Sequence, residues 1–347
     1  MNGKTHQVSK KRLFIVLIKR TFVVALAFFM ALLLGLYGCV SDMPGRSYRG
    51  ELAPLTAEEV VFRDELHQHV EKLSMQIGVR NTNNMDNLRQ SADYIADEMQ
   101  QAGLRVTRQT YEANGEMCDN VIGELPGKGA SQEILVIGAH YDTVYHCPGA
   151  NDNGSGVAAL LAIAGKMGSG EFRRTIRFVG FVNEEWPFFQ SSLMGSQVYA
   201  RACYENGDNI VGMISLETIG YYSDEPQSQR YPFPFSVFYP SKGNFIGFVG
   251  NWDSRSFVRE TVGFFRENCD FPSEGAAVPD AVKDAGRSDH RSFWEVGYQA
   301  LMITDTAPFR YPYYHTRKDT IDKLDFDRLA RVTAGLEKVI AELAKIR

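Results

Sequence analysis

The sequence predicts an α/β protein in which a β-sheet lies between layers of helices. Short apolar runs suited to buried strands alternate along the chain with longer segments of helical periodicity. Residues able to bind metals or to transfer protons follow directly after several of these apolar runs. Because such sheets bind ligands at the carboxyl ends of their strands, the two observations support each other.

The periodicity predicts the elements in order. Helices are expected at 56–77, 84–101, 156–167, 191–203 and 326–346. Strands are expected at 104–111, 120–124, 133–138, 175–182, 211–216, 244–249 and 300–303. Thr56 is the expected N-cap of the first helix, and Gly103 is expected to end the second. Residues 223–243, with four prolines, are typical of a surface loop.

Residues 1–39 are predicted to lie outside this fold. Basic residues up to Arg20 precede an apolar run from Thr21 to Tyr37, which is near the minimum length for crossing a bilayer and indicates a cytoplasmic N-terminus. The run ends in Leu36-Tyr37-Gly38-Cys39, which resembles a bacterial lipoprotein signal with Cys39 as the lipidated residue. An uncleaved signal anchor is the alternative. Both interpretations place the rest of the chain outside the cytoplasm, attached to a membrane on the periplasmic or cell-surface side.

The remaining chain is predicted to form a tether, residues 40–55, and one catalytic domain, residues 56–347. With 347 residues and 44% hydrophobic content, the chain can bury one large core or two small ones. A net charge of -5 without a basic stripe gives no reason to expect nucleic acid as a partner. The sequence shows no internal repeat.

Cysteine pairing stays open at this stage. Besides Cys39, the chain contains Cys118, Cys147, Cys203 and Cys269, whose spacing is not a zinc pattern. An exported location permits disulfides, and a bridge between Cys118 and Cys147 is one possibility.

Five potential metal ligands occur where five separate segments end. They are His140, Asp152, Glu185, Glu217 and His315. Two imidazoles and three carboxylates suit a pair of divalent metals, with zinc the best match. A single His or Glu after a strand would be an ordinary loop residue, so the recurrence is what indicates a site. The sequence therefore predicts a metal-dependent hydrolase.

Other residues near these ligands have candidate supporting roles. Glu184 adjoins Glu185, and at a strand end the two side chains diverge, so Glu184 is free to act as a general base. Asp142 can fix the tautomer of His140, two residues earlier. Tyr314 can donate its hydroxyl to an oxyanion. Asp289 and His290 are expected behind the ligands or, alternatively, as a polar cap on the following helix. Taken alone, the glycine-rich turn after Asp152 would suit a phosphate loop or a simple turn. The His-x-Asp segment before it favours a metal site instead.

The order of these motifs resembles the zinc-dependent aminopeptidases of metallopeptidase family 28. The motifs are His-x-Asp at 140–142, Asn-Asp-Asn-Gly-Ser-Gly at 151–156, Asn-Glu-Glu at 183–185, Ser-Leu-Glu at 215–217, Ser-Asp-His at 288–290 and Tyr-His-Thr at 314–316. The resemblance covers roughly residues 80–345. It implies a single α/β domain with a central mixed, mostly parallel β-sheet flanked by helices, a phosphorylase/hydrolase-like fold.

The resemblance also implies two zinc ions per chain. One would be held by His140, Glu217 and Asp152, and the other by His315, Glu185 and Asp152. Glu184 matches the general base of the family and Tyr314 a frequent oxyanion partner. The peptide bond after Asp152 is expected to be cis. Glu217 departs from the pattern, because well-studied members often have Asp there.

The activity implied is removal of the N-terminal residue from peptide substrates. Glutaminyl cyclases, which are similar in fold and use one zinc, are an alternative, but they usually have Trp where this chain has Tyr314. A catalytically inactive peptidase-like binding module is another, although every expected position is filled here. Aromatic residues flank the ligands and would either line an apolar pocket for the N-terminal side chain or pack in the core. They are Trp186, Phe188, Phe189, Phe309, Tyr311 and Tyr313.

Overall fold

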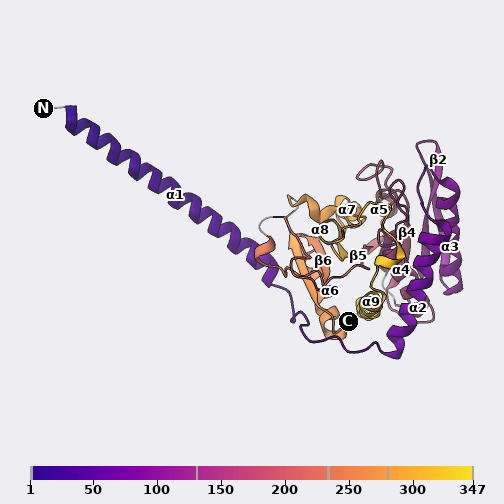
Figure 1. Cartoon of the computed structure of the whole chain (residues 1–347). Coiled ribbons are helices and arrows are strands. Elements are labelled where there is room, and N and C mark those ends of the chain that lie inside the picture. Colours follow the sequence, from indigo (N-terminus) through magenta and orange to yellow (C-terminus); the bar gives the residue numbers. More distant parts are fainter. Residues whose placement is uncertain (1–2, 130–131, 233–234, 280, 346–347) are drawn as a thin grey trace. The chain divides into compact units, whose positions relative to one another are not determined.

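The computed structural model describes residues 3–129, 132–232, 235–279 and 281–345 (Figure 1). The chain divides into two compact units, Met1–Asp42 and Met43–Arg347. The first unit contains one long helix, α1 (Gly3–Ser41). Within it, Phe14–Gly35 is long and apolar enough to cross a membrane, judged by length and composition, and no other described helix meets that test. The segment also includes Lys19 and Arg20, so it is longer than the predicted apolar run. The side chain of Cys39 lies outside the described residues.

The second unit is built on one eight-stranded sheet in the order β1-β2-β4-β3-β5-β8-β6-β7. Its strands are β1 (Arg105–Ala113), β2 (Glu116–Leu125), β3 (Glu133–His140), β4 (Thr175–Phe181), β5 (Asn209–Glu217), β6 (Ile246–Asn251), β7 (Ser273–Val278) and β8 (Ala300–Thr304). The central pairs β4/β3, β3/β5 and β5/β8 are parallel, as is β6/β7, whereas β1/β2, β2/β4 and β6/β8 are antiparallel. The predicted fold class, a single α/β domain with a mixed and mostly parallel sheet, is confirmed.

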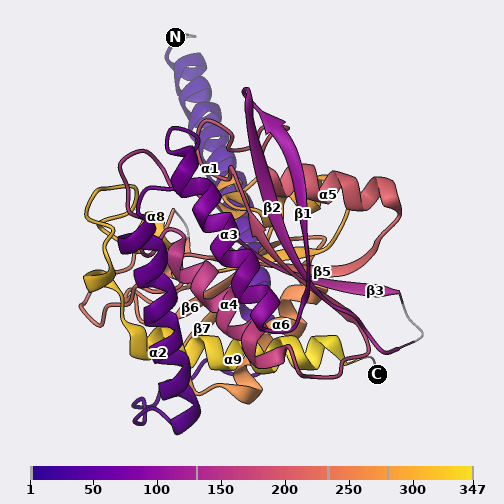
Figure 2. The same cartoon turned by 90° about the vertical axis from the view of Figure 1, so that its right-hand side faces the viewer.

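Helices cover both faces of the sheet (Figure 2). They are α2 (Ala57–Glu71), α3 (Met85–Gln101), α4 (Gly154–Met167), α5 (Gly195–Asn206), α6 (Arg255–Asn268), α7 (His290–Glu295), α8 (Ala307–Arg310) and α9 (Phe326–Ala344). Side chains alternate between faces along a strand. In β3, Leu135 and Ile137 pack in the core formed with α2, α3, α4, α6 and α9, whereas Ile134 and Val136 pack with α5 and α7. The central strands are thus buried on both sides, which explains their continuous apolar runs.

Helix α2 begins where the sequence predicts. The Thr56 hydroxyl accepts the N–H of Glu59, and the Glu59 carboxylate accepts the N–H of Thr56, so the two form a capping box. The α-helical geometry ends at Glu71, and the predicted last turn is instead a π-helical segment, Lys72–Ile77. Helix α3 ends as predicted, just before Gly103, whose φ of 83° is favourable for glycine.

The sequence prediction has no counterpart for α6, α8 and β7. Strand β7 has the sequence Ser-Glu-Gly-Ala-Ala-Val, which lacks the large apolar residues that mark a strand. Its pairing with β6 comes from tertiary contact. The predicted loop 223–243 contains only one short 3-10 turn, Phe235–Val237, among its described residues.

The predicted tether contacts the α/β unit from Met43 onward. The carbonyl of Pro44 accepts a hydrogen bond from Arg266 of α6 at 3.0 Å. The hydroxyl of Ser47 accepts the N–H of Ser273 in β7, also at 3.0 Å. These contacts bind residues before the first domain helix to the far edge of the sheet.

Four cysteines, Cys118, Cys147, Cys203 and Cys269, are free and buried. The bridge between Cys118 and Cys147 that an exported location permits is not formed.

Stability is expected to fall in mild acid because of His69 on α2. Its Nδ1 lies 2.5 Å from the Tyr94 hydroxyl, and burial lowers the pKa of His69 from 6.5 to about 4. The unfolded chain therefore binds the proton more readily than the folded chain. The contribution of neutral His69 to the free energy of unfolding is present above pH 6.5 and is lost as the pH falls toward 4. The loss at pH 5 should be about 2 kcal/mol. Urea unfolding at pH 7.5 and 5 should show a smaller loss for His69→Gln.

The matched control is His67→Gln, two residues away with a side chain that is 52% exposed. It should behave like the unaltered chain. Equal losses in His69→Gln and the unaltered chain would contradict the role of His69.

Candidate metal centre

The parallel core of the sheet brings the predicted site residues to one edge. Strands β4, β3, β5 and β8 are neighbours and run in the same direction, so their carboxyl ends lie together. His140 and Glu217 are the last residues of β3 and β5. Glu184 and Glu185 follow the end of β4 by a few residues. This is the edge at which such sheets bind ligands.

The five predicted ligands form two groups that share Asp152. His140 Nε2 lies 3.4 Å from Asp152 Oδ1 and 3.2 Å from Glu217 Oε2. His315 Nε2 lies 3.1 Å from Asp152 Oδ2 and 3.4 Å from Glu185 Oε1. Each oxygen of Asp152 therefore faces a different imidazole. Both groups have the residue types and spacing of a metal site.

The donor atoms fit divalent cations. His140 Nε2, Asp152 Oδ2 and Glu185 Oε1 are buried and have no hydrogen-bond partner. Buried polar atoms rarely lack a partner. Because these three atoms lie close to one another and none has a hydrogen-bond partner, they indicate a place where a cation can bind. Burial raises the pKa of Glu184 well above its usual range, with Glu185 and Glu217 adding to the effect against the opposing influence of His140. A cluster of buried carboxylates needs positive charge to be stable, and a divalent cation held by these residues would supply it.

The loop that carries Asp152 is tied to β5 by the next residue. The peptide bond between Asp152 and Asn153 is cis, as the resemblance implied. Asn153 Oδ1 accepts the N–H of Thr218 at 3.0 Å, and its Nδ2 donates to the carbonyl of Leu216 at 2.8 Å. These two residues flank Glu217, so one carboxamide couples two potential ligands. A Cβ at Gly156 would collide with the Asn153 side chain and the Leu216 carbonyl, which is why the turn needs glycine.

Asp142 holds the pair of glutamates. Its Oδ1 accepts the N–H of Glu184 and its Oδ2 accepts the N–H of Glu185, each at 3.0 Å. His140 Nδ1 lies 3.5 Å from Asp142 Oδ1 and 3.2 Å from the Asp142 carbonyl oxygen. The hydrogen bond of His140 Nδ1 is therefore made with the Asp142 carbonyl, while the Asp142 carboxylate, predicted to accept it, lies close by and fixes the backbone from which the glutamate side chains diverge. Glu185 extends toward His315, whereas Glu184 Oε2 lies 3.9 Å from His140 Nε2.

The three residues of the Ser-Asp-His motif contact different parts of the structure. Ser288, to which the sequence assigned no role, donates its hydroxyl to Glu217 Oε2 at 2.7 Å. Asp289 is fully buried, and burial raises its pKa to about 7. It occupies the N-cap position of α7 but makes no capping hydrogen bond. His290 Nε2 lies 2.7 Å from the Ala285 carbonyl, and its ring packs edge-on against Trp294, so this imidazole contacts the helix region.

Tyr314 lies against the His315 imidazole. The two rings stack with centroids 3.8 Å apart and an interplanar angle of 21°. Burial raises the pKa of the Tyr314 hydroxyl well above its usual range, so the hydroxyl keeps its proton. It can therefore act as a hydrogen-bond donor beside the centre.

The sequence did not predict a role for Arg80, which holds two backbone segments beside the centre. Its guanidinium is fully buried and donates to the carbonyls of Tyr141, Pro148 and Gly149 at 2.8, 2.7 and 3.0 Å. These carbonyls lie beside His140 and before Asp152, so Arg80 braces both segments. Arg80 also donates to the nearby carbonyls of Leu73 and Gly78. No local pattern marks its role at the centre, because the three carbonyls beside the centre lie at least 61 residues away in sequence.

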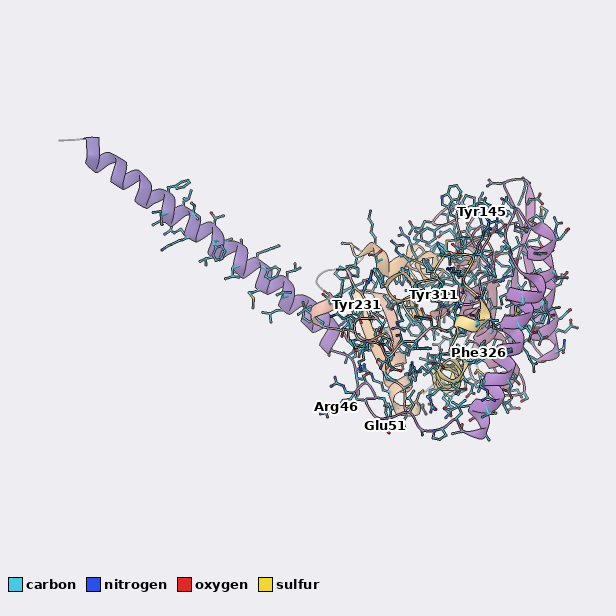
Figure 3. All side chains as sticks on the ribbon, in the orientation of Figure 1. Arg46, Glu51, Tyr145, Tyr231, Tyr311 and Phe326 are labelled. Carbon is cyan, nitrogen blue, oxygen red and sulfur yellow. The ribbon has the colours of Figure 1, made fainter. Side chains whose placement is uncertain are left out.

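An apolar cavity of about 140 Å³ opens beside the centre. Glu217, Thr218 and Tyr314 border it on the side of the potential ligands. Its apolar lining comes from the predicted loop, from β6 and the residue before it, from β8 and from α8: Tyr231, Phe235, Tyr239, Phe245, Phe248, Val249, Met302 and Phe309. Figure 3 labels Tyr231 in this lining.

Of the six aromatic residues that the sequence placed either in an apolar pocket or in the core, Phe309 lines this cavity. Trp186 and Phe188 border a separate, smaller cavity that also contacts Asp142 and Glu185. Tyr311, also labelled in Figure 3, is buried and donates its hydroxyl to Asp319.

The fold and the cluster define a class: α/β proteins of the aminopeptidase-like fold with a buried His and carboxylate centre. The family model described as peptidase family M28 matches residues 120–340. The chain belongs to this family. It is 35% identical over 283 residues to uncharacterized protein YfbL of Escherichia coli K12, covering 79% of this chain and 86% of that protein. It is 26% identical over 277 residues to a probable leucine aminopeptidase 1 of Trichophyton verrucosum, covering 74% and 68%.

Solved structures agree on the fold. A zinc aminopeptidase from Bacillus subtilis, BSAP, superposes with a TM-score of 0.67 at 18% identity, covering 82% of this chain and 95% of that one. The glutaminyl cyclase of Bacteroides thetaiotaomicron superposes with a TM-score of 0.62 at 19% identity, covering 80% and 97%. At these identities the likeness is one of fold, which two different activities share.

Proposed function

We propose that this chain is a two-zinc aminopeptidase that hydrolyses the N-terminal peptide bond of peptides. The observation that carries the proposal is the position of Asp152, whose two oxygens face the two imidazoles, as a bridging ligand requires. In the proposed assignment, His140 and Glu217 complete one zinc site, and His315 and Glu185 complete the other. Bound zinc would supply Lewis-acid chemistry, polarising the scissile carbonyl and lowering the pKa of water.

Glu184 is the proposed general base. Its carboxylate is buried beside His140 but lies farther from that imidazole than Glu217 does, at 3.9 against 3.2 Å. The positive charge that the centre needs favours the ionised form of Glu184. It can then take the proton of the attacking water and return it to the leaving amine. The protonated hydroxyl of Tyr314 donates to the oxygen on which negative charge develops.

The apolar cavity beside Glu217 supports a preference for large apolar N-terminal residues. An apolar side chain gains free energy by leaving water for such a lining, whereas a charged one loses its hydration. The likeness to leucine aminopeptidases points the same way.

Two measurements test the proposed activity. Metal analysis of the purified chain should find two zinc ions, and a screen of aminoacyl-anilides should rank Leu and Phe above Lys and Asp. A strong preference for Lys-anilide or Asp-anilide would contradict the role of the cavity. Release of pyroglutamyl peptide from an N-terminal Gln substrate, with no anilide hydrolysis, would instead favour a glutaminyl cyclase. Two bound zinc ions without turnover of either substrate class would favour an inactive binding module.

Export and anchoring through residues 1–39 complete the proposal, with lipid on Cys39 as the favoured attachment. Lipidation with several acyl chains binds membranes firmly, whereas one chain binds weakly. Cys39→Ser is expected to block both lipidation and processing, which leaves a longer chain without lipid that still contains Phe14–Gly35. Detergent partition and mass measurement of the mature chain would show this. Unchanged processing and partition would favour an uncleaved anchor formed by Phe14–Gly35.

A further inference from the structure

The two halves of the centre differ in how their ligands are held. His140 and Glu217 end buried strands of the sheet. His315 instead lies in the loop after α8, with a left-handed φ of 57° and a side chain that is 38% exposed. A ligand on an exposed loop needs other contacts to keep its position.

Asp319, four residues later in the same loop, makes those contacts. It is fully buried, and its carboxylate accepts the N–H of Asn151 at 2.8 Å and the N–H of Asp152 at 3.0 Å. The Asp319 carbonyl oxygen accepts the N–H of Ala150 at 3.3 Å. Asp319 therefore accepts three successive N–H groups of the loop that carries Asp152, the ligand shared by both halves. These three hydrogen bonds are called the Asp319 clasp.

Hydrogen bonds within the loop connect Asp319 to the residues on either side of His315. The N–H of Asp319 donates to the carbonyl of Thr316 at 3.1 Å, and the N–H of Tyr314 donates to the carbonyl of Tyr311 at 3.3 Å. The Tyr311 hydroxyl donates to Asp319 Oδ1 at 2.8 Å, which closes the turn on itself. His315 thus lies inside a closed turn. Among the described residues of this turn, Asp319 is the one whose carboxylate contacts the Asp152 loop.

The His140 half does not depend on this turn. Asn153 joins the Asp152 loop to β5 on both sides of Glu217, and Arg80 holds the carbonyls just before that loop. These contacts would keep Asp152 beside His140 if the Asp319 clasp were lost.

We propose that Asp319 is a positioning residue that sets the zinc affinity of the His315 half of the centre and leaves the His140 half little affected. The proposal rests on the two-zinc function above. A carboxylate accepts hydrogen bonds on both oxygens, whereas an amide has one acceptor and one NH₂ that would face an N–H donor. Asp319→Asn therefore breaks part of the clasp with little change in volume. Comparable supporting partners are worth about 10–100-fold in metal affinity.

The test is a zinc titration of the metal-free full chain against a chromophoric chelator. The unaltered chain should bind two zinc ions. Asp319→Asn should bind the first with nearly unchanged affinity and the second about 10–100-fold more weakly. Tyr311→Phe, which removes one donor to Asp319, should fall between the two. The matched control is Asp322→Asn, the same change on an exposed side chain of the same segment, which should titrate like the unaltered chain.

Excess zinc separates positioning from a folding defect. Because only the second affinity is lowered, aminoacyl-anilide turnover of Asp319→Asn should recover toward the unaltered value as zinc is raised, with unchanged circular dichroism. Two zinc affinities equal to those of the unaltered chain would overturn the inference, and so would equal weakening of both. An unaltered chain that binds fewer than two zinc ions would overturn the proposed function and this inference together.

Discussion

Glu184→Gln is expected to lower turnover about 10²–10⁴-fold while both zinc ions stay bound. Glutamine has the size and polarity of glutamate but cannot accept the proton of the attacking water. The backbone N–H of Glu184 donates to the Asp142 carboxylate, so a change of the Glu184 side chain leaves that hydrogen bond intact. Steady-state anilide hydrolysis and metal analysis on the same preparation measure the two effects. A surface control, Glu171→Gln, alters a side chain that is 73% exposed and should change neither.

Two outcomes would contradict the role of Glu184 as a base. One is a Glu184→Gln variant with near-normal turnover. The other is a variant whose loss of activity disappears when zinc is restored, because the residue would then act as a ligand.

Removing single ligands is expected to empty the two halves of the centre separately. Glu185→Ala should lose the zinc of the His315 half, because only His315 and Asp152 remain there, and metal affinity depends on the full ligand set. Glu217→Ala should lose the zinc of the His140 half for the same reason. Asp152→Ala, which removes the shared carboxylate, should lose both. Turnover should fall below detection in all three variants.

Metal content after dialysis against a weak chelator distinguishes these patterns. We expect one zinc ion per chain for Glu185→Ala and for Glu217→Ala, and none for Asp152→Ala. Glu184→Gln serves as the matched control, since it changes the neighbouring carboxylate and should keep both ions. Full metal content in Glu185→Ala would rule out its assignment as a ligand.

Local patterns in the sequence were enough to predict the framework of the fold. The parallel strands β3, β4, β5 and β8 are largely buried on both faces, so each appears as a mostly apolar run, which Arg177 interrupts in β4. The N-cap of α2, Thr56, could also be predicted, because its signal lies within a few consecutive residues. His140, Glu185 and Glu217 lie at or just after the ends of these strands, whereas Asp152 and His315 lie in loops. The order of all five along the chain matches one family, so the sequence predicted that they would meet.

Tertiary structure alone decided what holds those residues in place. Strand β7 lacks large apolar residues and becomes a strand through its pairing with β6. The apolar cavity takes Tyr231 and Tyr239 from a segment whose prolines are typical of a loop. Such roles depend on surroundings that no short window of sequence contains.

The supporting polar network shows the same division most clearly. Asp319 meets the N–H of Asp152 across 167 residues, Arg80 meets the carbonyl of Gly149 across 69, and Ser288 meets Glu217 across 71. Hydrogen bonds of this kind depend on distances of a few ångströms that only the packed fold sets. The sequence by itself therefore determined which groups could do the chemistry, and the tertiary structure determined which other groups keep them in position.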